Sequence, residues 1–135
     1  MTAKVFFDSN TLLYLATDDA EKAQRAETLL REGGTISVQV LNEMSLACRR
    51  KFRMAWDEVD EFLSPVRARC PVRVIDEETY DLGRRLAERH QFQVYDAMIV
   101  AAALLAGCDT LYSEVMHDGL RVGHDLTIRN PFRQE

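Results

Sequence analysis

Acidic side chains stand at the ends or in the first turns of the elements that the sequence predicts, next to otherwise apolar residues. These candidates are Asp8, Glu43, Asp96, Glu114 and Asp118. Carboxylates in such places can transfer protons or hold a cation. Taken singly, each also has a structural explanation. An aspartate at a helix start is a common cap that contributes about 1 kcal/mol, and Glu43 also suits a solvent-exposed helix face.

The elements that must position these acids follow from the spacing of apolar residues. Short apolar runs predict strands, and apolar residues at helical spacing predict helices between them. The predicted strands are residues 5–7, 35–38, 72–75, 110–113 and 126–129. The predicted helices lie at about residues 12–16, 20–32, 39–48, 56–63, 77–90 and 96–106. Strands that alternate with helices predict an α/β fold with a parallel sheet covered by helices on both faces.

A parallel sheet of this kind gathers functional groups at the carboxyl ends of its strands. Asp8 ends the first strand, Glu43 lies one turn into the helix after the second, and Asp96 starts an apolar helix. Glu114 and Asp118 follow the fourth strand. Two carboxylates ~4 Å apart repel each other by about 4 kcal/mol at an effective dielectric near 20. A divalent cation would neutralise such a cluster and can activate water for attack on phosphorus.

Ligand chemistry narrows the choice of ion. Oxygen ligands favour Mg²⁺ or Mn²⁺, whereas zinc sites usually contain cysteine and histidine at close spacing. The three cysteines are far apart in the chain and no C-x-x-C pair occurs. We therefore expect Mg²⁺ (or Mn²⁺) and reduced thiols, which are typical of a cytoplasmic protein.

Length and composition predict one domain over residues 1–135, with 47% hydrophobic and 29% charged residues. A chain of this size buries enough surface to fold without disulfides or a structural metal. The apolar run at residues 98–106 is too short for a membrane helix, which needs roughly 20 residues. The first residues lack the basic and apolar segments of a signal peptide. We therefore expect a soluble, cytoplasmic protein with no membrane partner.

The net charge of −5 argues against a purely electrostatic nucleic-acid binder. Two basic clusters nevertheless stand out, CRRKFR at residues 48–53 and RRLAER at residues 84–89. Arginine presents a planar fork that suits phosphate. Solvated helix faces are the simpler explanation of each cluster taken alone, and phosphate binding remains the alternative.

Four segments together resemble the PIN domain family, and specifically the VapC-like toxin nucleases of prokaryotic toxin–antitoxin pairs. The segments are VFFDSNTLLYL, VLNEM, YDAMIVAAALLAGCDTLYSE and HDG, and the resemblance covers nearly the whole chain. It implies a three-layer α/β/α sandwich with a central parallel sheet. It also implies an Mg²⁺- or Mn²⁺-dependent endoribonuclease that cleaves RNA, forms a homodimer and is blocked by an antitoxin protein.

The resemblance assigns roles residue by residue. Asp8, Glu43 and Asp96 match the first three acids of the family. Asp8 and Asp96 are expected to hold the metal, while Glu43 orients or deprotonates the attacking water. Asn10 and Ser113 match polar residues that orient the acids and the water. Nearby arginines are expected to hold the RNA backbone, which positions a strand without reading its bases.

The sequence departs from the family at the fourth acid. After LYSE the family usually has an aspartate, and this chain has Val115. Either Glu114 or Asp118 turns into the site as a substitute, or the site has three acids. The departure affects a second metal ion and leaves the first ligands, Asp8 and Asp96, untouched.

Two other classes of protein compete with this interpretation. Val115 also fits a catalytically weakened PIN module that binds RNA or a protein partner without cleaving it. Residues 8–11 resemble the D-x-D-x-T motif of haloacid-dehalogenase phosphatases, in which the first aspartate is a nucleophile, but Asn10 replaces the second aspartate. Phosphorylation of Asp8 would favour the phosphatase, and metal-dependent RNA cleavage would favour the nuclease. A response-regulator receiver is disfavoured because no second acid stands beside Asp8.

Overall fold

The computed structural model describes residues 4–133. In chain order its elements are β1 (Val5–Phe7), α1 (Ser9–Leu12), the 3₁₀ helix η1 (Leu13–Ala16), α2 (Ala20–Glu32), β2 (Ile36–Ser37), α3 (Val38–Arg50), α4 (Trp56–Arg69), β3 (Val72–Arg73), α5 (Glu77–His90), α6 (Val94–Leu105), β4 (Thr110–Tyr112), β5 (Arg121–Val122) and β6 (Leu126–Arg129). The predicted α/β class is confirmed.

The strands form a central, mainly parallel sheet. Four of them are ordered β1-β4-β6-β5, with β1, β4 and β6 parallel and β5 antiparallel to β6. The parallel pair of β2 and β3 continues this sheet beyond β1 through a bridge between Phe6 and Thr35. The Phe7 amide donates to the Thr35 carbonyl oxygen at 3.0 Å. The carboxyl ends of β1, β2 and β4 therefore lie along one edge.

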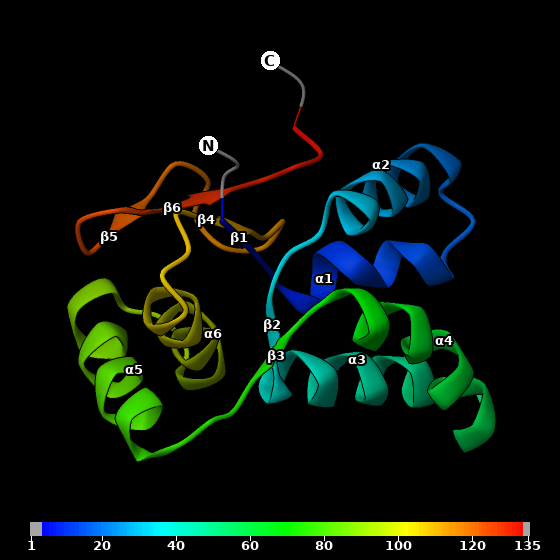
Figure 1. Ribbon diagram of the computed structural model, residues 1–135, viewed down its shortest axis with the longest axis horizontal. Helices are drawn as coiled ribbons and strands as arrows, with labels where there is room; N and C mark the ends of the chain where they lie inside the picture. Colours follow the sequence, from blue (N-terminus) through cyan, green and yellow to red (C-terminus); the bar gives the residue numbers. More distant parts are fainter. Residues whose placement is uncertain (1–3, 134–135) are drawn as a thin grey trace.

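The helices lie on two sides of the strands, which is the three-layer arrangement expected (Figure 1). In that view α5 and α6 lie side by side to the left, and α1 to α4 lie to the right. Every residue of α6 from Ala97 to Ala103 is buried, as its apolar sequence predicts. Gly83 on α5 permits this packing, because a Cβ there would lie 2.7 Å from the Cε atom of Met98.

The strand interiors anchor the site edge. Phe6 and Phe7 of β1, Leu111 of β4 and Ile128 of β6 are all fully buried. Burying a large apolar side chain contributes roughly 1.5–3 kcal/mol, so the strand ends that follow these residues are held firmly in place. Within residues 4–133, no helix has the length and apolar character needed to cross a lipid bilayer.

The sequence predicts a helix that ends near Pro65, and this is wrong because α4 continues to Arg69. A proline removes one helical hydrogen bond and usually breaks a helix. Here Pro65 lies on the exposed side of α4. The buried side continues past it and consists of Val59, Leu63, Val66 and Cys70. Burial of the last two therefore outweighs the lost hydrogen bond.

Other differences concern short elements. The first helical segment starts at Ser9 rather than residue 12, since Asp8 caps it. The strand expected at residues 72–75 pairs only over Val72–Arg73. β5 was not predicted, because two residues carry no detectable periodicity. α6 begins at Val94, so Asp96 lies in its first turn and not at its start.

Candidate active site

Asp8 lies where β1 ends and α1 begins, and its side chain is only 1% exposed. One carboxylate oxygen accepts a hydrogen bond from the Ser9 amide at 2.7 Å, which makes Asp8 the cap of α1. The other oxygen accepts bonds of 2.8 Å from Asn10 Nδ2 and from Ser113 Oγ. These donors are all neutral, so they orient the carboxylate without cancelling its charge. The predicted supporting residues, Asn10 and Ser113, thus contact Asp8 directly.

The surroundings of Asp8 disfavour its ionised form. Burial is the main cause, and it raises the pKa of Asp8 from 3.8 to about 6. The negative charge of Glu43 raises this pKa further, while hydrogen bonds from Ser113, Ser9 and Asn10 lower it. A buried carboxylate with these surroundings is typical of a functional site.

Glu43 lies on α3, six residues beyond the Ser37 cap, and its side chain lies near Asp8. Its Oε1 accepts a hydrogen bond from Ser9 Oγ at 2.8 Å, and its Oε2 accepts one from Gln39 Nε2 at 2.9 Å. Ser9 therefore bridges two acids, since its amide binds Asp8 and its hydroxyl binds Glu43.

Asp96 approaches from the first turn of α6 and is half-buried. Burial raises the pKa of Asp96, and the negative charge of Glu43 raises it further. Within residues 4–133, no basic side chain forms an ion pair with Asp8, Glu43 or Asp96. These three carboxylates, called the acid cluster below, therefore keep an uncompensated negative charge.

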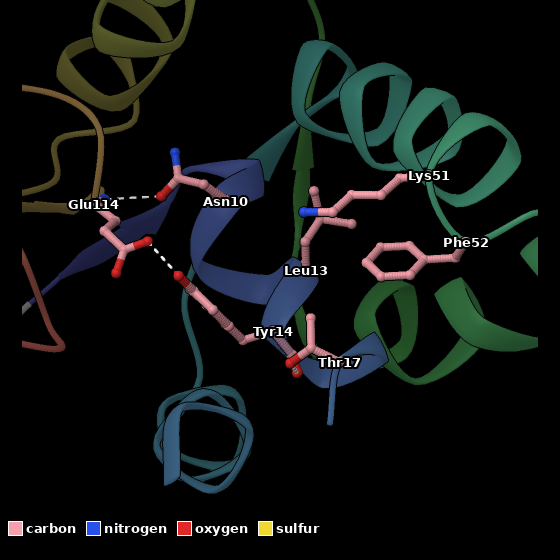
Figure 2. A pocket seen from close by; sticks show the side chains of 7 residues that line it. All are labelled: Asn10, Leu13, Tyr14, Thr17, Lys51, Phe52 and Glu114. Carbon is pink, nitrogen blue, oxygen red and sulfur yellow. Dashed lines mark hydrogen bonds between the residues drawn. The ribbon is translucent and has the colours of Figure 1, made fainter. Parts of the chain in front are cut away.

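Glu114 differs from the acid cluster because it has a basic partner. Its carboxylate forms an ion pair of 2.6 Å with Lys22 of α2 and accepts a 2.5 Å hydrogen bond from the Tyr14 hydroxyl. Burial raises the pKa of Glu114, but the bonds from Lys22 and Tyr14 outweigh it and lower that pKa. Figure 2 shows this carboxylate directed at Tyr14, while the Glu114 amide donates to Asn10 Oδ1 at 2.8 Å.

Asp118 is also paired with a basic group. Its two oxygens accept 2.8 Å hydrogen bonds from the Asn130 amide and from Arg133 Nη1. The Asn130 bond is the main cause that lowers the pKa of Asp118, and Arg133 adds to it. Asp118 thus binds the segment that follows β6. Val115, where the family usually has its fourth acid, is 69% exposed. The carboxylates of Glu114 and Asp118 already bind these partners. Catalytic roles for the two residues stay predictions.

The sequence did not point to several residues that organise the site. Ser9 and Gln39 each donate a hydrogen bond to Glu43. Gln39 precedes Glu43 by four residues on α3, a spacing that places two side chains on one helix face and was available from the sequence. Tyr14 and Lys22 bind Glu114 across about a hundred residues of chain, and no local pattern signals such a contact.

The raised pKa of Asp8 predicts how stability depends on pH in metal-free protein. Below pH 4 Asp8 is protonated in both states, and above pH 6 it is ionised in both. Between these values only the folded state holds the proton, so stability falls as pH rises, by about 3 kcal/mol in total. Urea unfolding in EDTA should show this fall in wild type relative to Asp8→Asn. A constant difference between the two proteins from pH 4 to 7 would contradict it.

The acid cluster has the donor chemistry that Mg²⁺ and Mn²⁺ require, because these ions prefer carboxylate oxygens. Across the described residues, no group of three or more His, Cys, Asp or Glu side chains is arranged to hold one ion together. A site with two carboxylates agrees with this geometry, since Mg²⁺ commonly takes one or two carboxylates and keeps several waters.

Comparisons with known proteins agree with the fold described above. The sequence model of the PIN domain family matches residues 5–114 of this chain. A toxin–antitoxin complex from Klebsiella pneumoniae is similar in structure, with a TM-score of 0.73 and 17% identity over 97% of this chain and 100% of that one. DNA-bound VapBC from Salmonella typhimurium gives a TM-score of 0.69 and 18% identity over 96% and 99% of the two chains.

A third similar structure is VapC20 from Mycobacterium tuberculosis, described as a sarcin–ricin loop cleaving toxin. Its TM-score is 0.65, with 15% identity over 82% of this chain and 88% of that one. No curated protein is significantly similar to this chain in sequence. At these identities the solved structures establish a common fold. The match over residues 5–114 goes further, and the chain belongs to the PIN domain family.

Proposed function

We propose that this protein is a divalent-metal-dependent endoribonuclease. The observation that carries the proposal is the acid cluster, in which the negative charge of Glu43 raises the pKa of both Asp8 and Asp96. All three acids are partly or fully buried, and none has a basic partner among the described residues. Such a cluster is unfavourable by itself, and a bound cation removes the repulsion. Membership of the PIN domain family supports the same reaction class.

Asp8 and Asp96 are the proposed metal ligands. When bound, Mg²⁺ or Mn²⁺ would lower the pKa of a water and stabilise negative charge on phosphate oxygens. The donors around Asp8 would keep its carboxylate aimed at one point, because Asn10 and Ser113 both hold the same oxygen. Asp96 makes no hydrogen bond to another described side chain, which leaves both of its oxygens available.

Glu43 is the proposed general base. Ser9 and Gln39 each hold one of its oxygens, so its orientation is fixed before substrate arrives. Each carboxylate oxygen has two lone pairs, so a water can still donate to Glu43 beside these bonds. Preorganisation of this kind reduces the reorganisation needed during the reaction.

We further propose that the protein is the toxin of a toxin–antitoxin pair and acts in the cytoplasm. Structures described as toxin–antitoxin complexes share its fold, and its three cysteines are free and buried, as in a reducing compartment. An antitoxin that places a Lys or Arg beside the acid cluster would neutralise the charge that a metal ion otherwise balances.

A homodimer is expected from the large apolar side chains left on the surface. Leu46, Trp56, Val94 and Tyr95 are all at least half exposed. Leu46 and Trp56 line one surface hollow together, and contiguous exposed apolar residues usually mark interfaces. Sedimentation velocity at tens of micromolar should show twice the mass of the chain, and a profile of monomer alone at that concentration would contradict the proposal.

Cleavage of RNA tests the proposed activity. The purified protein should cut single-stranded RNA in Mg²⁺ or Mn²⁺, and EDTA should stop the reaction. Adding excess Mn²⁺ after EDTA should restore it, which excludes irreversible damage by the chelator. Absence of cleavage over a broad set of RNAs, together with retained RNA binding, would instead favour the non-cleaving PIN module.

Val115→Asp tests whether the fourth acid limits the enzyme. A new carboxylate near the site attracts a metal ion, and even at an effective dielectric near 20 this is worth a few kcal/mol before desolvation. We expect tighter Mn²⁺ binding, faster cleavage and lower stability in EDTA, measured by calorimetry and thermal unfolding. If Glu114 already fills this role, Val115→Asp should change little and Glu114→Gln should cripple cleavage.

A further inference from the structure

A pocket of about 170 Å³ opens beside the acid cluster and is not used by the proposed chemistry. Asn10 and Tyr14 line it on the side of α1 and η1, and Lys51 and Phe52 line it at the end of α3 (Figure 2). Asn10 also donates a hydrogen bond to Asp8, so the pocket wall directly contacts the acid cluster. A group bound here would be adjacent to a phosphate held at Asp8.

Phe52 supplies the pocket with an aromatic face. Its half-buried ring pairs with no other ring in the described chain, and its one aromatic contact is with Lys51, whose Nζ lies 5.6 Å from the ring centroid. Tyr14 also lines the pocket and is fixed in place, because its hydroxyl binds Glu114 and its ring packs edge-on against Phe132. A planar group can therefore stack on Phe52 in a pocket whose Tyr14 wall is rigid.

The turn that presents Phe52 is held in place by its neighbours. Arg49 donates to the Met54 carbonyl oxygen at 2.8 Å and stacks on Trp56, with 4.6 Å from Cζ to the ring centroid. Arg53 has a positive φ of 53°, which a side chain adopts at some cost. Backbone strain of this kind is commonly retained at functional sites. The position of Phe52 is thus built into the fold.

On the side of α3 the charge beside the pocket is positive and suits a polyanion, while Glu114, which also lines the pocket, is paired with Lys22. Lys51 belongs to the basic cluster CRRKFR at residues 48–53, which continues past the end of α3. Within residues 4–133, neither Arg50, Lys51 nor Arg53 forms an ion pair. The protein as a whole carries a net charge of −5, so this free positive charge is a local feature beside the acid cluster.

We propose that the pocket is a nucleobase subsite, in which one base of single-stranded RNA stacks on Phe52 while Lys51 contacts the adjacent phosphate. This inference rests on the proposed ribonuclease function. The volume is below the roughly 300–1,000 Å³ of sites that enclose whole drug-sized ligands, which suits a single base and not a whole dinucleotide. Stacking tolerates any base, so the subsite positions the strand without strict sequence choice.

Binding of two labelled probes in EDTA tests the subsite without requiring cleavage. The first probe is a fluorescein-labelled pool of random twelve-nucleotide RNAs, and the second is an abasic ribose-phosphate chain of the same length. Wild type should bind the RNA more tightly than the abasic chain, because only the RNA carries bases that can stack. Phe52→Leu, which keeps an apolar side chain, should weaken RNA binding about tenfold and leave the abasic chain unaffected, since stacking on an aromatic ring is lost.

Lys51→Gln should instead weaken the binding of both probes to the same extent. Because one phosphate contact is removed, the slope of log Kd against log salt should fall by about 0.7. Matched controls are Tyr80→Leu, which removes an exposed aromatic ring from α5, and Arg85→Gln, which removes a charge from the same helix. Both controls should bind the two probes as wild type does, and circular dichroism verifies that every variant is folded.

The subsite is overturned if folded Phe52→Leu binds both probes like wild type, or if it weakens both equally. The subsite is also overturned if Phe52→Leu loses a protein partner that co-purifies with wild type while its RNA binding is unchanged. The pocket would then serve that partner. If wild type cleaves RNA and Phe52→Leu has unchanged probe binding, the proposed ribonuclease function stands and the subsite is rejected. Base-dependent binding without cleavage would keep the subsite and remove the proposed enzyme.

Discussion

Replacing Asp8 by asparagine is expected to abolish metal-dependent RNA cleavage while leaving thermal stability in EDTA unchanged or higher. The loss of rate should be roughly a thousandfold or more, because a metal ion contributes several kcal/mol to the transition state. Stability should not fall, since the variant removes a charge whose side chain is only 1% exposed. Part of that gain is offset, because the asparagine NH2 group replaces one carboxylate oxygen and would face either the Ser9 amide or the Asn10 and Ser113 donors.

Cleavage of a labelled RNA in Mn²⁺ and thermal unfolding in EDTA measure the two effects. Asp81→Asn is a matched control, since Asp81 is an exposed acid on α5 for which wild-type behaviour is expected. Mn²⁺ titration by calorimetry should show weak or no binding to Asp8→Asn. An Asp8→Asn protein that cleaves RNA at the wild-type rate would show that Asp8 is not a metal ligand.

Glu43→Gln is expected to lower cleavage by roughly 10²–10⁴-fold, which is the usual contribution of a general base. Glutamine keeps the size of the side chain and can still accept the hydrogen bond from Ser9 Oγ. Metal binding should weaken far less than in Asp8→Asn, because Asp8 and Asp96 remain. The separation of rate from metal affinity therefore distinguishes a base from a ligand.

The hydrogen bond that Gln39 donates to Glu43 gives a second test of this role. Gln39→Leu is an informative companion, since it removes only the 2.9 Å hydrogen bond to Glu43 Oε2 and should have a smaller effect. Equal losses of Mn²⁺ affinity in Glu43→Gln and Asp8→Asn would instead make Glu43 a ligand.

Much of the fold was accessible from the sequence, because its buried elements have strong patterns. The apolar run of α6 and the helical spacing along α2 predicted helices that the structure contains. The errors lie where tertiary packing decides the outcome. Pro65 stays helical because the residues after it are buried, and β5 exists only because β6 is there to pair with it.

The candidate site was accessible for a different reason. Asp8 and Asp96 stand beside buried elements, so their approach to one edge follows from a parallel sheet. The sequence cannot reveal which acids carry a compensating charge, since this depends on distant contacts such as that of Lys22 with Glu114. The ion pair with Lys22 distinguishes Glu114 from the acid cluster, whose members have no basic partner among the described residues. In the sequence, Glu114 and the members of the acid cluster all stand close to the end of a predicted strand or the start of a predicted helix.

The hydrogen bond from Ser113 to Asp8 joins residues that are 105 positions apart, and the bond from the Glu114 amide to Asn10 spans 104. During synthesis the amino-terminal end of the chain leaves the ribosome long before β4 has been made. Asp8 therefore cannot acquire its native orientation until nearly the whole polypeptide has emerged, and long-range contacts of this kind form slowly. A nascent or prematurely terminated chain that ends before Ser113 lacks an organised acid cluster, so translation itself delays the moment at which the proposed nuclease site is complete.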